Sequence, residues 1–89
     1  MKIVFSGHVL NETIPEFSLL GWNITKAKVR QTIKNPKWTG ITKYGQPAFM
    51  SLINEKYILR VIAKREGDII RVITLYIAKR GRYESTKED

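Results

Sequence analysis

The chain of 89 residues contains no cysteine, a single histidine, three prolines and only eight acidic residues. Without cysteine, a disulfide framework and thiolate metal sites are excluded. The lone histidine, His8, and the absence of carboxylates clustered at ligand spacing predict that the protein uses no metal or other cofactor. A glycine-rich phosphate loop, a GxSxG elbow and a Cys–His pair are also missing, which argues against the enzyme classes built on them.

Long hydrophobic runs are missing too. No apolar run approaches the roughly 20 residues that a membrane-spanning helix needs. The first apolar run, Ile3–Phe5, is far too short for the core of a signal peptide. Together with the absence of cysteine, these features predict a cytoplasmic protein that does not enter a membrane.

Basic residues outnumber acidic ones by 16 to 8, which gives a net charge of +8 and a sequence pI near 10.0. A basic body suggests a polyanionic partner, with nucleic acid first and an acidic protein second. A solvated basic surface that binds nothing specific is the alternative.

The segment Tyr57–Tyr83 predicts an antiparallel hairpin. Two runs rich in Ile, Val and Tyr, residues 57–65 and 69–77, flank the turn Glu66-Gly67-Asp68. Both faces of this hairpin are substantially apolar, and two helices can cover only one face of a small sheet. We therefore expect the second face to stay partly open, as a shallow groove or a homodimer contact.

Arginines interrupt both apolar runs of the hairpin. Arg60 lies in the first run and Arg71 in the second, and the basic, aromatic cluster Lys79–Tyr83 follows. If the two arginines are buried, each needs an anionic partner. With only eight acidic residues in the chain, we expect that partner to be a phosphate or another protein.

Residues 26–34 have the signals of a well-marked helix. Thr25 can serve as N-cap, and Asn35-Pro36 stops the helix. Val29 and Ile33 give the buried seam. The earlier segment, His8–Leu20, also has helical spacing, but Pro15 predicts that this helix is kinked or split at Ile14-Pro15.

Three cations form one stripe on the second helix, because Lys26, Arg30 and Lys34 stand at i, i+4 and i+8. Like charges at this spacing cost a few tenths of a kcal/mol per pair, and a helix selected for stability alone would interleave Glu. The stripe is either a phosphate-facing ridge or a set of snorkelling side chains on a solvated face.

The order of elements is β-α-α-β-β-β-β, in which the strand at residues 2–5 is optional. This order predicts an α+β fold, with two N-terminal helices packed on a four-stranded, mostly antiparallel twisted sheet. We expect one domain over residues 1–83 and a frayed acidic tail over residues 84–89.

The chemistry available to this chain is cationic and phenolic. Metal-independent RNA cleavage needs a base for the 2′-hydroxyl proton, cations for the dianionic transition state and an acid for the leaving oxygen. The candidate catalytic residues are His8, Lys79, Arg82 and Tyr83, and the candidate phosphate-binding or RNA-binding residues are Lys26, Arg30, Lys34, Arg60, Arg71 and Arg80. A structural or capping role is the alternative for His8.

Short motifs in a fixed order extend over most of the chain. They are His8, Ile24-Thr25, Val29, Asn35-Pro36, Leu59-Arg60-Val61-Ile62, Gly67-Asp68, Val72-Ile73-Thr74-Leu75-Tyr76 and Lys79-Arg80. In this order the chain resembles the small RelE/BrnT-like toxins of prokaryotic toxin–antitoxin systems, and more closely an uncharacterised domain family of that superfamily. The chain departs from the family at Glu12-Thr13, where members carry an Arg, and in its longer segment from His8 to Ile24.

The resemblance implies a RelE-like fold and an endoribonuclease that acts on free or ribosome-bound mRNA and is inhibited by an acidic antitoxin protein. Two other functions remain open at this stage. One is a non-catalytic module that binds RNA or DNA, and the other is an interaction protein that dimerises through its open sheet face.

Overall fold

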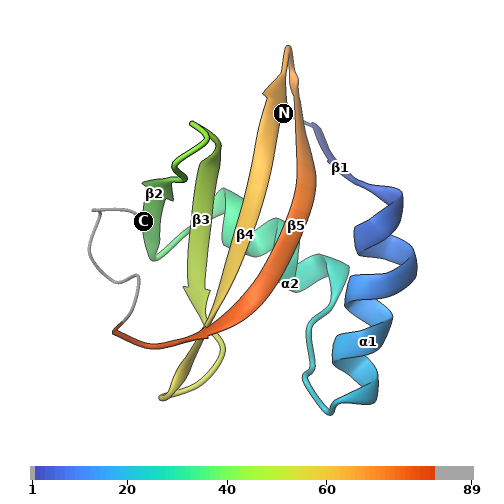
Figure 1. The fold of residues 1–89 in the computed structure, drawn as a ribbon, viewed down its shortest axis with the longest axis vertical. Helices are drawn as coiled ribbons and strands as arrows, with labels where there is room; N and C mark the ends of the chain where they lie inside the picture. The colour runs from blue at the N-terminus through green and yellow to red at the C-terminus, as the bar shows by residue number, and fades with distance from the viewer. Residues whose placement is uncertain (1, 82–89) are drawn as a thin grey trace.

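The computed structural model describes residues 2–81. Its elements, in chain order, are β1 (Lys2–Phe5), the π-helical segment η1 (Val9–Thr13), α1 (Ile14–Leu19), α2 (Lys26–Lys34), β2 (Trp38–Ile41), β3 (Pro47–Leu52), β4 (Tyr57–Glu66) and β5 (Ile69–Lys79). The predicted α+β class is confirmed: two helices accompany one open sheet (Figure 1).

The sheet has five strands in the order β1-β5-β4-β3-β2. Strands β2 to β5 pair antiparallel, whereas β1 pairs parallel with β5, from Lys2 opposite Ile69 to Phe5 opposite Val72. The predicted number of four strands was therefore wrong, and the optional N-terminal strand is present. The sequence of this four-residue segment could not predict its pairing, because the partner strand lies 67 residues away in the chain.

The hairpin of β4 and β5 forms where the sequence predicted it. Glu66 pairs with Ile69 around a two-residue turn, in which Gly67 takes a φ of +62° that glycine adopts without strain. The register of the β4–β5 pair shifts by one residue within the hairpin: Ile62 pairs with Thr74, whereas Ala63 pairs with Val72. Ile73 is the extra residue of this β-bulge.

The helices and one face of the sheet enclose the core. Thr25 Oγ1 accepts a hydrogen bond from the Lys28 N–H at 3.1 Å, which confirms the predicted N-cap of α2. Val29 and Ile33 of α2 are buried in one cluster with Leu59 and Val61 of β4. Figure 1 shows α2 behind the sheet and α1 beside the edge formed by β1.

The sequence predicted a helix that is kinked or split at Ile14-Pro15; the backbone changes there from π-helical to α-helical geometry, and the helix continues through Pro15 without a break. The Ile14 N–H donates to the Val9 carbonyl five residues back, which is the π-helical pattern, and α1 then begins with Pro15 in its first turn. Because Pro15 has no backbone N–H, it cannot donate a helical hydrogen bond at this position. The π geometry itself was not predicted.

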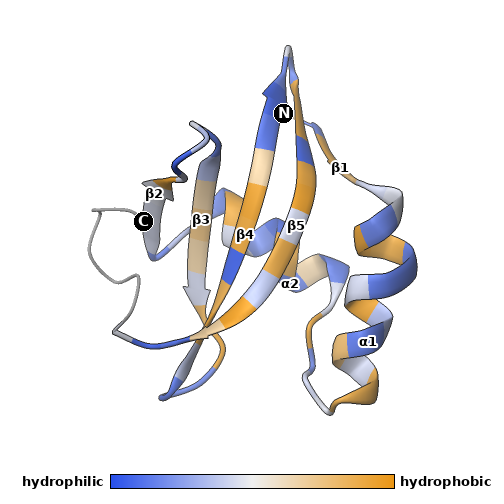
Figure 2. Ribbon diagram, viewed as in Figure 1, coloured by the Kyte–Doolittle hydropathy of each residue, from blue (hydrophilic) through white to orange (hydrophobic). Residues whose placement is uncertain are grey.

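The opposite face of the sheet also carries apolar side chains. They include Ala48, Met50, Ile58 and Ile62, which are 0–5% exposed, and Arg60 lies at their centre. Figure 2 shows that apolar positions dominate β4 and β5, with hydrophilic positions between them. The centre of this face is thus buried, although no helix within residues 2–81 covers it, whereas Leu52, Thr74 and Tyr76 on the same face are partly exposed.

Candidate functional site

The three cations predicted to form a stripe do lie along one side of α2. Lys26, Arg30 and Lys34 are all exposed, while Val29 and Ile33 point into the core. We call these three residues the helix ridge. No acidic residue occurs in α2, and none of the three forms an ion pair within residues 2–81. The ridge is therefore a continuous positive surface, with the Arg30 guanidinium also held 5.3 Å from the centroid of the Phe5 ring.

Arg60 lies in a different environment, because it is only 2% exposed. Its cross-strand neighbours are Met50 on β3 and Tyr76 on β5, and the guanidinium donates a hydrogen bond to the Tyr76 hydroxyl. The Arg60 Cζ atom is also 5.7 Å from the centroid of the Tyr76 ring. In this arrangement the side chain is part of the packed sheet and does not reach the surface.

Arg71 is half-buried and already has an anionic partner. Its Nε and Nη2 atoms both lie 3.1 Å from Oε1 of Glu66, across the turn of the hairpin. The hydrogen bond from Arg71 lowers the pKa of Glu66 below its ordinary value of 4.5, with smaller contributions from the charges of Arg71 and Lys64. Much of the charge of Arg71 is therefore balanced within the protein.

The two strand arginines share one face of the sheet but lie apart on it. Arg60 pairs with Tyr76 and Lys64 pairs with Arg71, so Arg60 and Arg71 are separated by four residues along β4, roughly 13 Å. The helix ridge belongs to α2, which packs on the other face. The predicted binding residues thus form separate groups and do not line one cleft.

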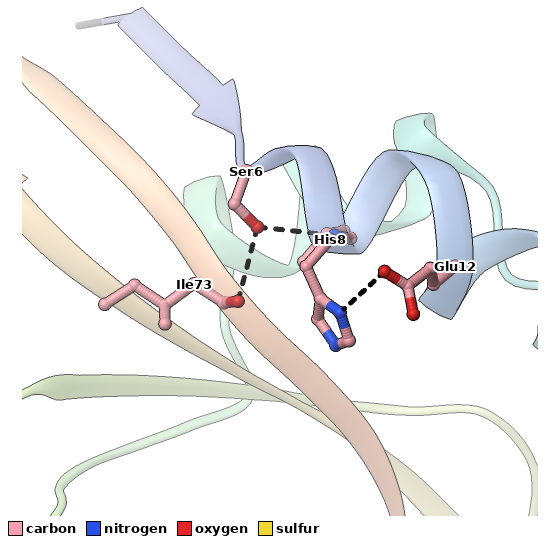
Figure 3. Close-up of polar contacts among 5 residues, drawn as sticks. Ser6, His8, Glu12 and Ile73 are labelled. Carbon is pink, nitrogen blue, oxygen red and sulfur yellow. Dashed lines mark hydrogen bonds and ion pairs between the residues drawn. The ribbon is translucent and has the colours of Figure 1, made fainter.

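His8 lies at the start of the helical segment, beside the β-bulge (Figure 3). Ser6 joins the two elements, since its hydroxyl donates to the Ile73 carbonyl at 3.4 Å and accepts from the Val9 N–H at 3.3 Å. One helical turn on, Oε2 of Glu12 lies 3.5 Å from Nδ1 of His8. Both side chains are more than half exposed, so the imidazole is accessible and has a carboxylate beside it.

Lys79 and Arg80 occupy the far end of β5. Lys79 pairs with Tyr57, and the Arg80 N–H donates to the Lys56 carbonyl at 2.8 Å. With Lys56 and Tyr57 these two residues line a hollow at the end of the hairpin. Arg82 and Tyr83, the other two predicted catalytic residues, lie outside the residues that the structure describes.

The described candidates for catalysis are not gathered in one place. His8 follows β1 next to Val72 and Ile73, whereas Lys79 lies six residues beyond Ile73 on β5, roughly 20 Å along the strand. Sequence reasoning also missed Glu12 and Ser6. Glu12 could have been found from its spacing, because i, i+4 residues meet on a helix. The role of Ser6 depends on the distant bulge and had no local signal.

Comparison of the chain with family models, with curated proteins and with solved structures gives no match. No helix within residues 2–81 is long and apolar enough to cross a bilayer. In the same residues, His, Asp and Glu side chains do not gather in groups of three or more that could hold a metal ion.

Proposed function

We propose that this protein binds RNA, and that the helix ridge on α2 is its main phosphate-binding surface. The observation that carries the proposal is the ridge itself: Lys26, Arg30 and Lys34 are exposed, aligned and without acidic neighbours on their helix. Between residues 2 and 81 there are fourteen basic and five acidic residues, so the surroundings add to this positive potential.

Binding to a labelled single-stranded RNA, measured by fluorescence anisotropy over a range of salt concentrations, tests the proposal. Because each neutralised phosphate releases counterions, the affinity falls steeply with salt, and replacing Lys26, Arg30 and Lys34 by Gln reduces the slope of that dependence. The matched control replaces Lys2, Lys37 and Lys56 by Gln, which removes the same charge from scattered positions. Equal losses in both variants contradict a role specific to the ridge.

A metal-independent endoribonuclease is the second candidate function, and the His8–Glu12 pair favours it. The Glu12 carboxylate lies beside Nδ1, so it favours the tautomer in which Nδ1 carries the proton and Nε2 is left to act as a base. In this function His8 takes the proton of the RNA 2′-hydroxyl, the 2′-oxygen attacks the adjacent phosphorus, and the 5′-oxygen of the next nucleotide leaves and takes a proton from water, while cationic side chains stabilise the phosphate that is attacked. Cleavage of RNA in the presence of EDTA tests it.

The RelE-like fold and the toxin role belong to the same proposal. Support for them comes from the motif order in the sequence and from the α+β architecture, with two helices preceding an antiparallel series of strands. The corresponding partners are RNA, which includes ribosome-bound mRNA, and an acidic antitoxin protein. A homodimer through the helix-free sheet face stays a prediction.

A further inference from the structure

A groove outside the predicted site lies along the β2 edge of the sheet. Its walls are the β2–β3 turn and the end of β4, which lie toward the same end of the sheet (Figure 1). Ile41, Tyr44 and Pro47 supply apolar surface on one side, and Lys64 and Arg65 stand on the other. We call this hollow the edge groove. It combines an aromatic ring, aliphatic surface and two cations.

Tyr44 is the most exposed aromatic side chain of residues 2–81, with 77% of its surface accessible. The turn that carries it is nonetheless well fixed. The Thr42 hydroxyl accepts hydrogen bonds from the N–H groups of Tyr44 and Gln46, at 3.3 and 3.2 Å, and Gly45 takes a φ of +80°. The ring is therefore held out into solvent by an ordered turn, which lowers the entropy cost of stacking a ligand on it.

Charge complementarity identifies the kind of ligand. Among residues 2–81, none of those that line the edge groove is acidic, whereas Lys64 and Arg65 are both exposed cations. A third cation, Lys43, lies with its Nζ 5.3 Å from the centroid of the Tyr44 ring. An occupant that suits the groove has a flat aromatic group for Tyr44 and negative charge for the cations. A nucleotide in a single strand has both.

We propose that the edge groove binds one or more nucleotides of single-stranded RNA, with a base stacked on Tyr44 and neighbouring phosphates held separately by Lys64 and Arg65, which leave β4 on opposite faces. The inference rests on the proposed RNA-binding function and adds to it a stacking site distinct from the helix ridge. The ridge supplies charge that any polyanion can use. The edge groove requires unpaired bases, so it confers a preference for single strands over duplex RNA.

The test compares a labelled oligouridylate with inorganic polyphosphate, which carries similar charge but has no bases. Stacking of one base on an aromatic ring corresponds to about 5-fold or more in affinity. We expect Tyr44→Ala to weaken oligouridylate binding by at least that factor and to leave polyphosphate binding unchanged, while Tyr44→Phe retains binding to both. Arg65→Gln weakens binding of both ligands more than Lys56→Gln does. Leu19→Ala, at another highly exposed apolar position, is the matched control for Tyr44→Ala.

The outcomes separate the inference from the proposed function. If the protein binds oligouridylate but Tyr44→Ala and Arg65→Gln bind it as tightly as the parent chain does, the edge groove is not a site, while RNA binding through the ridge stands. Equal weakening of oligouridylate and polyphosphate by Tyr44→Ala also overturns the inference, because it shows no contact with bases. If the parent chain binds neither ligand, both proposals fail. Ultraviolet crosslinking of the bound oligouridylate to Tyr44, located by mass spectrometry, is the positive result that requires no comparison of affinities.

Discussion

The guanidinium of Arg60 donates a hydrogen bond to the phenolic oxygen of Tyr76, its direct neighbour across the β4–β5 pair. Arg60 is 2% exposed, and the Tyr76 hydroxyl is one of the groups that hold its guanidinium inside the sheet. A phosphate could contact Arg60 only after the structure opens. This relationship makes Arg60 a structural residue in the described form and gives a stability test for it.

Tyr76→Phe removes the acceptor and keeps the ring. Because the buried guanidinium loses one hydrogen bond, we expect the free energy of unfolding to fall by about 1–3 kcal/mol in urea denaturation. Tyr44→Phe is the control, since the Tyr44 ring is exposed and its hydroxyl forms no hydrogen bond with a side chain of residues 2–81. Equal stability of the two variants would show that the Arg60–Tyr76 bond contributes nothing.

A second stability prediction concerns the contact between α2 and β3. Thr32 is 1% exposed, and its hydroxyl donates to the Lys28 carbonyl at 2.8 Å, so the Ser51 hydroxyl at 2.6 Å is the donor to Thr32. Thr32→Val keeps the shape but leaves Ser51 without this acceptor, at a cost of about 1–2 kcal/mol. A double-mutant cycle with Ser51→Ala measures the coupling, which we expect near 0.5–1.5 kcal/mol. The exposed Thr39→Val serves as control, and additive effects of the Thr32 and Ser51 changes rule the coupling out.

The Glu66–Arg71 pair predicts a pH dependence of stability. The pKa of Glu66 is lower in the folded chain than its ordinary value of 4.5, so the carboxylate form stabilises the fold. This contribution is fully present above pH 4.5 and is lost as the pH falls through the lowered pKa. We expect Glu66→Gln to lower the thermal midpoint slightly at neutral pH and to have no effect in acid. Both side chains of the pair are partly exposed, so added salt also reduces the difference.

The endoribonuclease proposal predicts a separation of cleavage from binding at His8. If His8 is the general base, His8→Ala lowers the rate of RNA cleavage by about 10²- to 10⁴-fold and leaves RNA affinity unchanged. Glu12→Gln gives a smaller loss, since it affects only the orientation of the imidazole. Asn11→Ala, exposed on the same segment, is the control. If the His8→Ala variant cleaves RNA at the parental rate, His8 is not the general base, and any nuclease activity comes from other residues or from a contaminant.

Elements with strong local signals were predictable from the sequence. The N-cap at Thr25 and the stop at Asn35-Pro36 delimit α2 without reference to the rest of the chain, and the Gly67-Asp68 turn marks the hairpin. The strand β1 and the π-helical turn at Val9–Thr13 were not predictable in the same way. Both depend on partners or on backbone geometry that a short stretch of sequence does not specify.

The site was predictable only in parts. The spacing of Lys26, Arg30 and Lys34 determines that they share one side of a helix, and they do. Whether that side faces the same cleft as Arg60 depends on which face of the sheet α2 covers. Because both faces of β4 are apolar, the pattern could not decide this, and Arg60 lies on the face away from α2.

The parallel pairing of β1 with β5 has a consequence for biosynthesis. Lys2 and Ile69 are partners in the sheet, so β1 must wait until β5, which lies 67 residues later in the chain, has been translated before it can join the sheet. An emerging chain can form α2 and the antiparallel pair β2–β3 early, but the edge strand at residues 2–5 stays unpaired until residues 69–72 have left the ribosome. Closing so distant a contact is slow compared with hairpin formation. The sheet is therefore completed only after β5 has been translated.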